Sequence, residues 1–442
     1  MDRADNFPKK IRIGIIGAGP AGLTTALAIE YYDRKKRFEV TLFERNSSPT
    51  DYPGVEYGIQ ERACRAFERI GIREKALHRS LRARKITFYN SRLEKKFRPI
   101  ELDGDWTRHV VRQEFVADLV GLVKRAKLLT NHEIVSVRPN EDRSVTLKAN
   151  IGEGRNEEFT FDAVLSCDGS SSTTRSQLFP MQDEKRDQGF SCIYMMLEAE
   201  KPLEAEERYL AMTNAGVSNL IMGEEATLTT FPLGKGRAAY GIGFDHQSRG
   251  HLWSRFDLDP DTEWADIPAN TREALARRLV EDACAHDPFY AEMLKHVQDW
   301  MSPRVYLWAM EDTDPLHPPY GETGNVLAIG DAAHVLLPTI GMGASTAIED
   351  GEMLGRFLVE GSAGVPGPEV FRQQFADSVA KPYAAERTEV WDDLVRRART
   401  AAEINFTDQH ERKRFAVGPQ IPHRTASRLV SAIEKAARAA GV

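Results

Sequence analysis

The hydrophobic pattern at the start of the chain predicts a strand, a glycine-rich turn, a helix and a second strand. Isoleucines alternate along residues 11–16, IRIGII, as in a short strand. Beyond a run of three glycines, Leu23, Ala26 and Leu27 stand at helical spacing within LTTALAIEYYDRKK. The next segment, FEVTLFE, is of strand type and ends on Glu44. The first forty-five residues are therefore expected to form one β-α-β unit.

The rest of the chain changes character twice. Helices are expected over 61–72 and 110–126, and residues 79–98, with eight basic residues and one acid, predict a polar-faced hairpin. Short strands follow over 133–162, and then the buried-type strand FDAVLSCDG. From about 188 to 244, strand-length pieces separated by glycine and charge predict an antiparallel sheet, and a helical stretch follows over 271–287. We expect α/β character to return at NVLAIGDAAH, before a helix from about Gly341 to Glu360 and the amphipathic stretches 391–404 and 428–441.

Composition narrows the functional class. The chain has 442 residues, 41% of them hydrophobic, which suits a sizeable core and two or three domains. The formal net charge of −7 argues against a dedicated nucleic-acid binder. No signal-peptide pattern opens the chain, and the apolar window 326–348 is interrupted by Asp331, His334 and Pro338. We expect a cytoplasmic protein, a monomer or homodimer, with neither a nucleic acid nor a membrane as partner.

The cysteines exclude several kinds of site. The four stand far apart, at Cys64, Cys167, Cys192 and Cys284. No C-x-x-C is present, which rules out zinc ribbons and dithiol redox centres and argues against a disulfide scaffold. We expect no metal site.

The glycine run is G-x-G-x-x-G, and it stands between a predicted strand and a predicted helix. Gly17 permits the tight turn, Gly19 lets the backbone approach a pyrophosphate, and Gly22 allows the helix to pack closely on the strand. Glu44, twenty-two residues beyond Gly22, can accept hydrogen bonds from ribose hydroxyls. The alternative is a glycine-rich turn that holds no ligand. The context favours a dinucleotide site.

Two further motifs follow strands. Asp168-Gly169 opens DGSSSTTR, although a lone Asp-Gly is usually only a turn. Gly330-Asp331 opens GDAAH, and an aspartate at the carboxyl end of a strand suits a sugar-alcohol hydroxyl. A helix that begins near Gly341 would aim its N–H groups at a ligand in front of it. For His334 we favour a capping or core role over a catalytic one.

The three motifs, in this order and at these separations, resemble the single-component FAD-dependent aromatic hydroxylases, the group of para-hydroxybenzoate and salicylate hydroxylases. The resemblance runs from Ile11 to about Leu358. It implies an α/β fold with a discontinuous Rossmann-like FAD-binding domain at 1–78, 105–187 and 305–360. An inserted antiparallel β-sheet substrate domain would occupy 79–104 and 188–304, and a C-terminal helical region 361–442.

By that resemblance, the cofactor-binding residues are those of the three motifs and an arginine in VVRQEFVADL. They are Gly17, Gly19, Ala21, Gly22, Glu44, Arg45, Arg112, Asp168, Gly169, Gly330, Asp331, Gly343 and Ala344. The loop with Pro338, Gly341, Met342 and Gly343 would lie against the flavin ring, and no catalytic acid or base is assigned. The chain departs from the family at GMGAS, 341–345, where G-Q-G-x-N is usual. DYPGVEYGIQ also lacks an arginine that several members carry.

The resemblance implies an FAD-dependent monooxygenase. NADH or NADPH would reduce FAD, and a C4a-hydroperoxyflavin formed with O2 would hydroxylate a phenol-like or acidic aromatic substrate. Residues of the predicted sheet are plausible walls of the substrate site, although each also fits a plain sheet core: Tyr194, Met196, Met222, Phe231 and Tyr240. His246 and Arg255 could hold an acidic substrate, but both also fit a solvated surface.

Other functions stay open at this point. The same scaffold could support another oxygen insertion, Baeyer–Villiger or epoxidation, on a secondary-metabolite substrate. A non-enzymatic, FAD-stabilised binding protein is the alternative from a different class. A flavin halogenase is disfavoured because W-x-W-x-I-P is absent, and a hydrolase because G-x-S-x-G and H-E-x-x-H are absent.

Overall fold

A parallel sheet forms the centre of the fold. The protein is described from a computed structural model over residues 9–93, 99–102, 104, 107–199, 212–223, 226–259, 261–284, 287–321 and 325–403. The sheet has five strands in the order β18-β12-β1-β2-β8, all pairs parallel. They are β1 (Ile11–Ile16), β2 (Phe38–Phe43), β8 (Lys127–Leu129), β12 (Ala163–Ser166) and β18 (Val326–Ala328). Because both faces are covered, its strands are short apolar runs.

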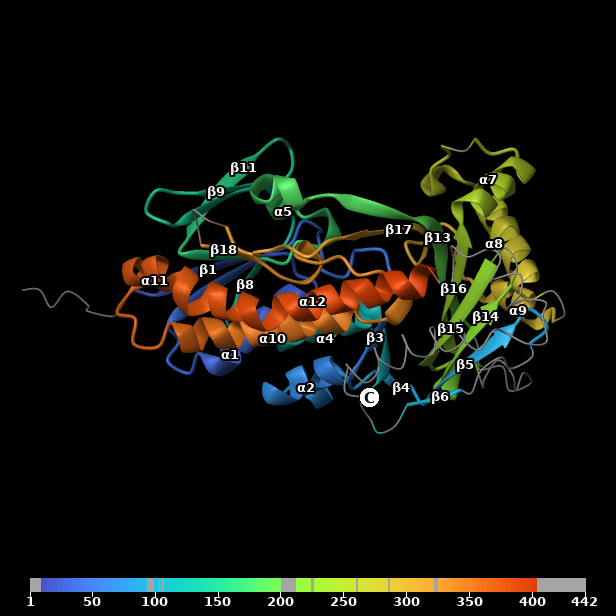
Figure 1. The fold of residues 1–442 in the computed structure, drawn as a ribbon, viewed down its shortest axis with the longest axis horizontal. Helices are drawn as coiled ribbons and strands as arrows, with labels where there is room; N and C mark the ends of the chain where they lie inside the picture. The colour runs from blue at the N-terminus through green and yellow to red at the C-terminus, as the bar shows by residue number, and fades with distance from the viewer. Residues whose placement is uncertain are drawn as a thin grey trace, which may run out of the picture.

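Helices cover one face of this sheet. Figure 1 shows α1 (Pro20–Tyr32), α10 (Gly343–Gly361) and α12 (Lys381–Ala402) running side by side. Glycines permit the close approach of α1 and α10, because a Cβ on Gly355 would lie 2.5 Å from the Ala28 Cβ and one on Gly351 would lie 2.6 Å from the Ala21 carbonyl oxygen. The other helices of eight or more residues in the described parts of the chain are α2 (Glu61–Arg69), α4 (Arg112–Leu122), α7 (His246–Arg255), α8 (Ala269–Ala283) and α11 (Pro368–Phe375).

Short helical segments connect these elements. Among the described residues, the short α-helices are α3 (Arg73–Ala76), α5 (Thr173–Leu178) and α9 (Phe289–Glu292). The 3-10 turns are η1 (Gly169–Ser171), η2 (Pro180–Gln182), η3 (Trp264–Asp266), η4 (Met293–His296), η5 (Gly330–Ala332) and η6 (Pro338–Ile340). A π-helical turn, η7 (Ala376–Ala380), leads from α11 into α12.

A three-stranded antiparallel sheet covers the other face of the parallel sheet. Its order is β11-β10-β9, with β9 (Glu133–Pro139), β10 (Val145–Asn150) and β11 (Asn156–Phe161). Side chains alternate along β1 accordingly. Ile13 and Ile15 join the core under the helices, while Ile16 packs with Phe161 under the small sheet.

The largest sheet stands at the other end of the molecule (Figure 1). Its order is β17-β13-β16-β15-β14-β5-β6. The strands are β5 (Lys85–Asn90), β6 (Ile100–Glu101), β13 (Lys185–Glu198), β14 (Val217–Met222), β15 (Ala226–Gly234), β16 (Arg237–Asp245) and β17 (Val305–Thr313). Along β13, Ile193, Met195 and Leu197 pack in the core shared with α7, α8 and α9. Cys192, Tyr194 and Met196 alternate with them and form what we call the inner face.

A small sheet joins the two halves. It comprises β3 (Glu56–Ile59), β7 (Arg108–Val111) and β4 (Leu81–Arg82), in the order β3-β7-β4. Val110 packs in the core of the parallel sheet, and the next residue, Val111, packs against Met196 of the inner face. Since neighbouring residues of a strand point to opposite faces, one strand touches both halves.

The structure confirms the α/β fold class and the opening β-α-β unit. The hairpin expected over 79–98 is matched only in part: β5 pairs in antiparallel fashion with the next strand, β6, but β4 belongs to a different sheet, and β5 also pairs in parallel with β14. The large sheet is therefore mixed. The helix expected over 110–126 begins at Arg112, since residues 110 and 111 pair with β3.

Some predictions lie outside the described residues, namely those on 94–98, on 200–211 and on 428–441. The domain boundaries stay predictions. Within the described ranges, no helix combines the length and the apolar character needed to cross a bilayer.

Candidate active site

The glycine turn after β1 is shaped for a close-approaching ligand. Gly17 has a φ of +95°, and a Cβ there would collide with the Cys167 carbonyl oxygen. A Cβ on Gly22 would collide with the Gly17 carbonyl oxygen. A Cβ on Gly19 would meet nothing within 4 Å, so the space beside Gly19 is open. No side chain caps α1, and its first N–H groups could therefore bind phosphate oxygens.

Glu44 lies at the end of β2, beside this turn. It is 9% exposed, and its carboxylate accepts hydrogen bonds from the Ala18 N–H at 3.2 Å and the Asn46 N–H at 2.9 Å. Each oxygen keeps a further lone pair, so the carboxylate could still accept ribose hydroxyls. The neighbouring Arg45 is exposed and lies over the Tyr52 ring, 5.5 Å from its centroid.

The loop after β12 uses its aspartate internally. The Asp168 carboxylate accepts hydrogen bonds from the hydroxyls of Ser166, Ser172 and Thr174 and from the Thr174 N–H. Gly169 has a φ of +80° and open space where a Cβ would stand. Asp168 therefore shapes the loop, and the backbone at Gly169 is the part that a ligand could approach.

Arg175 ties this loop to the third motif. It is 2% exposed, and its Nη1 donates to the Ala333 carbonyl oxygen at 3.0 Å. A second nitrogen, Nη2, donates to the Asp314 carbonyl oxygen at 2.7 Å. Burial lowers the pKa of Arg175, although Asp183 and Asp314 oppose that shift. The second and third motifs thus meet through one buried guanidinium.

The Asp331 carboxylate is a hydrogen-bond acceptor without a donor among the described residues. It lies in η5 after β18, is partly buried, and has no hydrogen-bond or ion-pair partner among the described residues. Burial raises the pKa of the Asp331 carboxyl, and the charge of His334 only partly offsets this. An otherwise unsatisfied carboxylate at this place fits a hydroxyl-rich ligand such as a ribityl chain.

Behind Asp331 lies a buried polar network. His334 donates from Nε2 to the Asp350 carboxylate at 2.7 Å, and the Gly330 N–H donates to the same carboxylate at 3.1 Å. Arg387 and Trp391 on α12 also donate to Asp350, at 2.8 and 3.1 Å. The core role expected for His334 agrees with this placement. The network fixes the Gly330-Asp331 turn against α10.

Arg112 begins α4 and is clamped by two tyrosines. It donates from Nε to the Tyr57 hydroxyl at 2.7 Å and from Nη1 to the Tyr52 carbonyl oxygen at 2.7 Å. Its guanidinium lies 4.7 Å from the Tyr52 ring centroid. Burial raises the pKa of Tyr57, Arg112 lowers it and Asp331 adds to the rise, so the charges of Arg112 and Asp331 both act at this hydroxyl. Nη2 has no partner among the described residues and could reach a phosphate.

The loop 338–343 is held by β3 and α12. Gln60, directly after β3, donates from its side-chain amide to the carbonyl oxygens of Ile340 and Gly341, at 3.3 and 3.0 Å. Thr339 donates to the Ala398 carbonyl oxygen of α12 at 2.8 Å. Gly341 takes up a left-handed φ of +62°.

Two residues of GMGAS have internal roles. The side chain of Met342 is fully buried with Leu394 and Val395 of α12, away from any ligand in front of α10. Ser345 accepts a hydrogen bond from the Gln60 N–H and donates one to the Gly58 carbonyl oxygen. The backbone of Gly343 and Ala344, at the open N-terminus of α10, is the part left for a ligand.

The inner face of the large sheet adjoins this loop. Tyr194 stacks on Tyr306 of β17, with ring centroids 5.8 Å apart. Tyr194 and Phe231 pack with Val55, which precedes β3. Tyr194 and Ile340 of the loop both pack against the buried cluster that contains Cys192 and Leu337. By its register opposite Thr227, Met222 stands on the inner face as well.

Tyr240 is placed differently from the other predicted substrate residues. It lies on the opposite face of the sheet, fully buried in the core with α8 and α9, and its hydroxyl donates to the Tyr290 carbonyl oxygen at 2.8 Å. Because a strand turns alternate side chains to opposite faces, Tyr240 cannot reach the inner face. Its assignment to the substrate site is therefore corrected.

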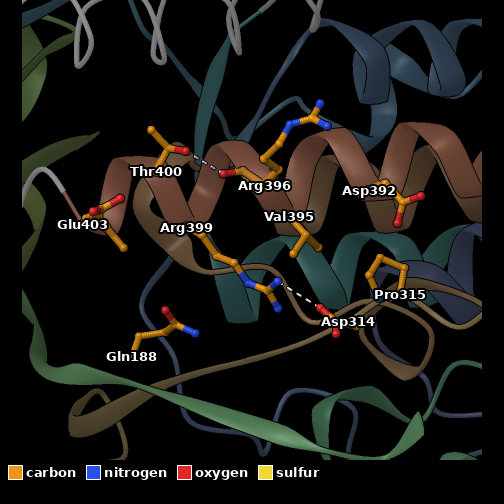
Figure 2. Close-up of a pocket in the computed structure, with 10 residues that line it drawn as sticks. Gln188, Asp314, Pro315, Asp392, Val395, Arg396, Arg399, Thr400 and Glu403 are labelled. Atoms are coloured by element: carbon orange, nitrogen blue, oxygen red, sulfur yellow. Dashed lines mark hydrogen bonds and ion pairs between the residues drawn. The ribbon is translucent and has the colours of Figure 1, made fainter.

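A pocket of about 420 Å³, lined mostly by polar and charged residues, lies beside α12, apart from the predicted cofactor residues (Figure 2). Its lining residues are Gln188, Asp314, Pro315, Asp392, Val395, Arg396, Arg399, Thr400, Ala402 and Glu403. Arg399 forms ion pairs with Asp312 and Asp314 at 2.7 and 2.9 Å, so its charge is neutralised within the protein. Over the described parts of the chain, no group of three or more potential ligands could hold a metal ion.

Sequence reasoning missed residues that arrive from distant segments. They are Tyr52, Glu56, Tyr57, His109, Arg175, Tyr306, Arg387 and Trp391. None belongs to a spaced motif except Arg175, which ends the DGSSSTTR run and could have been noted there as a cation near a cofactor loop. The others carry no local signal, since only the tertiary fold brings them to one place.

Comparison with known proteins agrees with this geometry. A family model described as "FAD binding domain" matches residues 10–305 and 309–398. An FAD-dependent monooxygenase of Aspergillus terreus is 23% identical over 418 residues, which cover 91% of this chain and 89% of that protein. A salicylate hydroxylase of Pseudomonas putida is 26% identical, covering 79% of this chain and 76% of that protein.

Solved structures show the same fold. Klebsiella pneumoniae HpxO complexed with FAD and uric acid is similar with a TM-score of 0.71 at 17% identity, over 97% of this chain and 98% of that one. A salicylate hydroxylase substrate complex gives a TM-score of 0.68 at 20% identity, over 98% of both chains. Because the family model covers most of the chain, the protein belongs to the FAD-binding-domain family of flavoprotein monooxygenases, the group of FAD-dependent aromatic hydroxylases that its three motifs resemble.

Proposed function

We propose that this protein is an FAD-dependent monooxygenase that uses NADH or NADPH and O2 to hydroxylate an aromatic substrate. One observation carries the proposal. The Asp331 carboxylate has no partner among the described residues, its charge and that of Arg112 both act at the Tyr57 hydroxyl, and Tyr194 of the inner face packs against the same buried cluster as Ile340 of the loop 338–343. Such an arrangement suits a cofactor held by one half of the molecule and an apolar substrate held by the other.

The residues present fit FAD. The open space at Gly19 and the uncapped start of α1 suit the diphosphate, and Glu44 suits the ribose. Asp331 would accept a hydrogen bond from the ribityl chain, and Arg112 would donate Nη2 to a phosphate. When bound, FAD reduced by NAD(P)H supplies, together with O2, an electrophilic oxygen atom.

The chain's own contribution would be positioning and exclusion of water. Apolar side chains of Val55, Val111 and Met196 close the space between β3 and the inner face. An aromatic ring could pack on Tyr194 or Tyr306, which already stack on each other. A water-poor site of this kind protects a reactive oxygen species and orients the ring that receives the oxygen atom.

The test is oxidation of NADH and NADPH by the FAD-loaded protein with a panel of phenols, aromatic acids and polyketide-like aromatics, with product masses recorded. The expected result is stimulated oxidation of one nucleotide and one added oxygen atom in the product, with FAD-free protein as the control. If neither nucleotide reduces the bound flavin, the proposal is wrong.

A second candidate is another oxygen insertion, Baeyer–Villiger or epoxidation, on a secondary-metabolite substrate. Several fungal relatives carry only the name FAD-dependent monooxygenase, which is compatible with either chemistry. Product structure distinguishes the two, because insertion into a ring C–C bond or across a double bond leaves no new phenol. A non-enzymatic binding protein would show FAD binding without substrate-stimulated oxidation.

A further inference from the structure

One face of the small sheet carries a carboxylate and an imidazole toward the substrate side. In the antiparallel pair of β3 and β7, His109 stands opposite Gly58 and Val111 stands opposite Glu56. Side chains of Glu56, His109 and Val111 therefore share one face. Val111 packs with Met196 and Leu233 of the large sheet, which shows that this face meets the inner face.

The two polar groups form a chain of hydrogen bonds that leaves one oxygen available. Nδ1 of His109 lies 2.7 Å from Oε1 of Glu56, and Nε2 lies 3.1 Å from the Ser218 hydroxyl. With Nδ1 donating to the carboxylate, Nε2 accepts from Ser218, so both ring nitrogens are satisfied. The Glu56 side chain is 15% exposed, and Oε2 has no partner among the described residues. His109 is thus an anchor, and Glu56 is the group with spare accepting capacity.

The Glu56 carboxylate stands beside the flavin-proximal loop. A Cβ built on Gly58 would lie 3.8 Å from Oε1 of Glu56 and 3.7 Å from the Gly341 carbonyl oxygen. The amide of Gln60, on the same strand end, donates to that carbonyl oxygen at 3.0 Å. The short strand β3 therefore positions Glu56 relative to the loop 338–343.

Aromatic rings surround the same place. Phe231 lies against the His109 ring, with centroids 5.6 Å apart. Burial raises the pKa values of Tyr194 and Tyr306, and the charge of Glu56 adds to the rise at both hydroxyls. The Tyr306 hydroxyl has no partner within the described part of the chain. The aromatic side chains thus surround the Glu56 carboxylate, and a substrate ring that packed on them would lie near this hydrogen-bond acceptor.

We propose that Glu56, anchored by His109, selects the substrate: the site takes aromatic rings that bear a hydroxyl or amino group and rejects the matching ring carboxylates. This inference rests on the proposed function and deepens it. A hydroxyl or amino group donates to Oε2, whereas a carboxylate offers no donor and adds a like charge in a partly desolvated place. Arg112 would not reverse this preference, because Nε and Nη1 are used by Tyr57 and Tyr52 and Nη2 is the nitrogen assigned above to a cofactor phosphate.

The experiment compares three probes on the same ring: phenol, aniline and benzoate. Their dissociation constants are measured from the change in flavin absorbance of the full-length, FAD-loaded protein, for the wild type and for Glu56→Gln. We expect the wild type to bind phenol and aniline at least about tenfold more tightly than benzoate, the factor that one hydrogen bond to a charged group provides. Glu56→Gln should reduce that ratio to within about threefold, because the amide can donate to benzoate.

Two further variants test whether Glu56 acts on substrate selection or only supports the structure of the site. Asp392→Asn removes a surface carboxylate that accepts from His317 at 3.0 Å, a matched pair outside the site, and should leave the ratio unchanged. His109→Gln keeps the carboxylate but loosens it, so phenol binding should weaken while benzoate stays rejected. FAD content is measured for each variant.

The outcomes distinguish the two proposals. If the wild type oxidises NAD(P)H but Glu56→Gln discriminates among the probes as the wild type does, the proposed role of Glu56 in substrate selection is wrong, while the proposed function stands. The same holds if benzoate binds best, or if phenol and aniline leave the flavin spectrum unchanged. A wild type that takes no electrons from either nucleotide overturns both proposals.

Discussion

Arg387 on α12 forms a fully buried ion pair with Asp350 on α10, with Nε donating to Oδ1 at 2.8 Å. The same guanidinium donates from Nη1 to Glu349 at 2.7 Å. Asp350 in turn holds His334 and the Gly330 N–H, so one arginine of the C-terminal helix braces the turn that presents Asp331. The C-terminal helices are thus part of the site's support.

Arg387→Met should destabilise the protein by about 3–5 kcal/mol, because the substitution leaves the Asp350 charge buried without its ion-pair partner. The measurement is the shift of the urea unfolding curve. Arg62→Met is the matched control, since Arg62 also pairs with Glu349, at 3.3 Å, but on a partly exposed side chain. We expect it to cost no more than about 1 kcal/mol. An equal loss of stability in the two variants would show that burial of the Arg387–Asp350 ion pair does not determine its contribution to stability.

Asp350 should also contribute an acid-sensitive component of stability. Burial alone would raise its pKa, but Arg387 and His334, together with hydrogen bonds from His334 and Trp391, outweigh it and lower the pKa from 3.8 to about 2. A lowered folded-state pKa stabilises the fold above the unfolded value, and this contribution disappears as the pH falls toward 2. The shift corresponds to about 2 kcal/mol.

Unfolding curves of the FAD-free protein between about pH 7 and pH 3 test this. Asp350→Asn should be less stable than the wild type at neutral pH, and its stability should fall less on acidification. Parallel pH profiles for the two proteins would contradict the assignment.

Substitutions at two glycines of the turn should affect stability and cofactor binding separately. Gly22→Ala should destabilise the FAD-free protein, because its Cβ would collide with the Gly17 carbonyl oxygen. Gly19→Ala should leave the FAD-free melting temperature unchanged, since its Cβ meets no protein atom within 4 Å. It should nevertheless weaken FAD binding by about tenfold or more, because the methyl group enters the space needed for close diphosphate approach. Thermal melts and fluorescence titration with FAD measure the two effects.

Asp331→Asn should change stability and cofactor affinity in opposite directions. Because burial raises the pKa of the Asp331 carboxyl, its ionised form costs stability at neutral pH, and removing the charge should raise the melting temperature of the FAD-free protein. FAD affinity should fall by about tenfold, through loss of a charged hydrogen-bond acceptor.

The control for Asp331 is Asp168→Asn, whose carboxylate is already used by three hydroxyls. That variant should lower the melting temperature. A lower melting temperature for Asp331→Asn as well would mean that Asp331 has a structural partner.

The two faces of the large sheet should respond differently to loss of a tyrosine hydroxyl. Tyr240→Phe removes the hydrogen bond to the Tyr290 carbonyl oxygen and should cost about 1 kcal/mol, with substrate kinetics unchanged. Tyr194→Phe should leave stability nearly unchanged and alter KM for the aromatic substrate, because Tyr194 belongs to the inner face. Urea unfolding and steady-state kinetics on the same preparations decide the matter, and a KM effect from Tyr240→Phe would reverse the assignment of faces.

The sequence by itself determined the elements whose chemistry is local. The alternation along β1, the glycines of the turn and Glu44 lie within one β-α-β unit, where spacing along the chain dictates spacing in the fold. Asp331 could be identified for the same reason, because an aspartate that follows a buried strand is placed by that strand. The family resemblance followed from these motifs, and the comparison with known proteins confirms it.

Only the tertiary structure decided how the distant segments meet. The basic run after residue 79 divides between two sheets, because β4 pairs with β7 while β5 pairs with both β6 and β14. The face assigned to Tyr240 depends on which side of the large sheet α8 covers, and a one-residue alternation cannot reveal that. Glu56 and His109, and likewise Asp350 and Arg387, come together through long-range packing that leaves no spacing to detect. Local propensity fixes elements, but the free energy of burying their faces decides which side chains share a site.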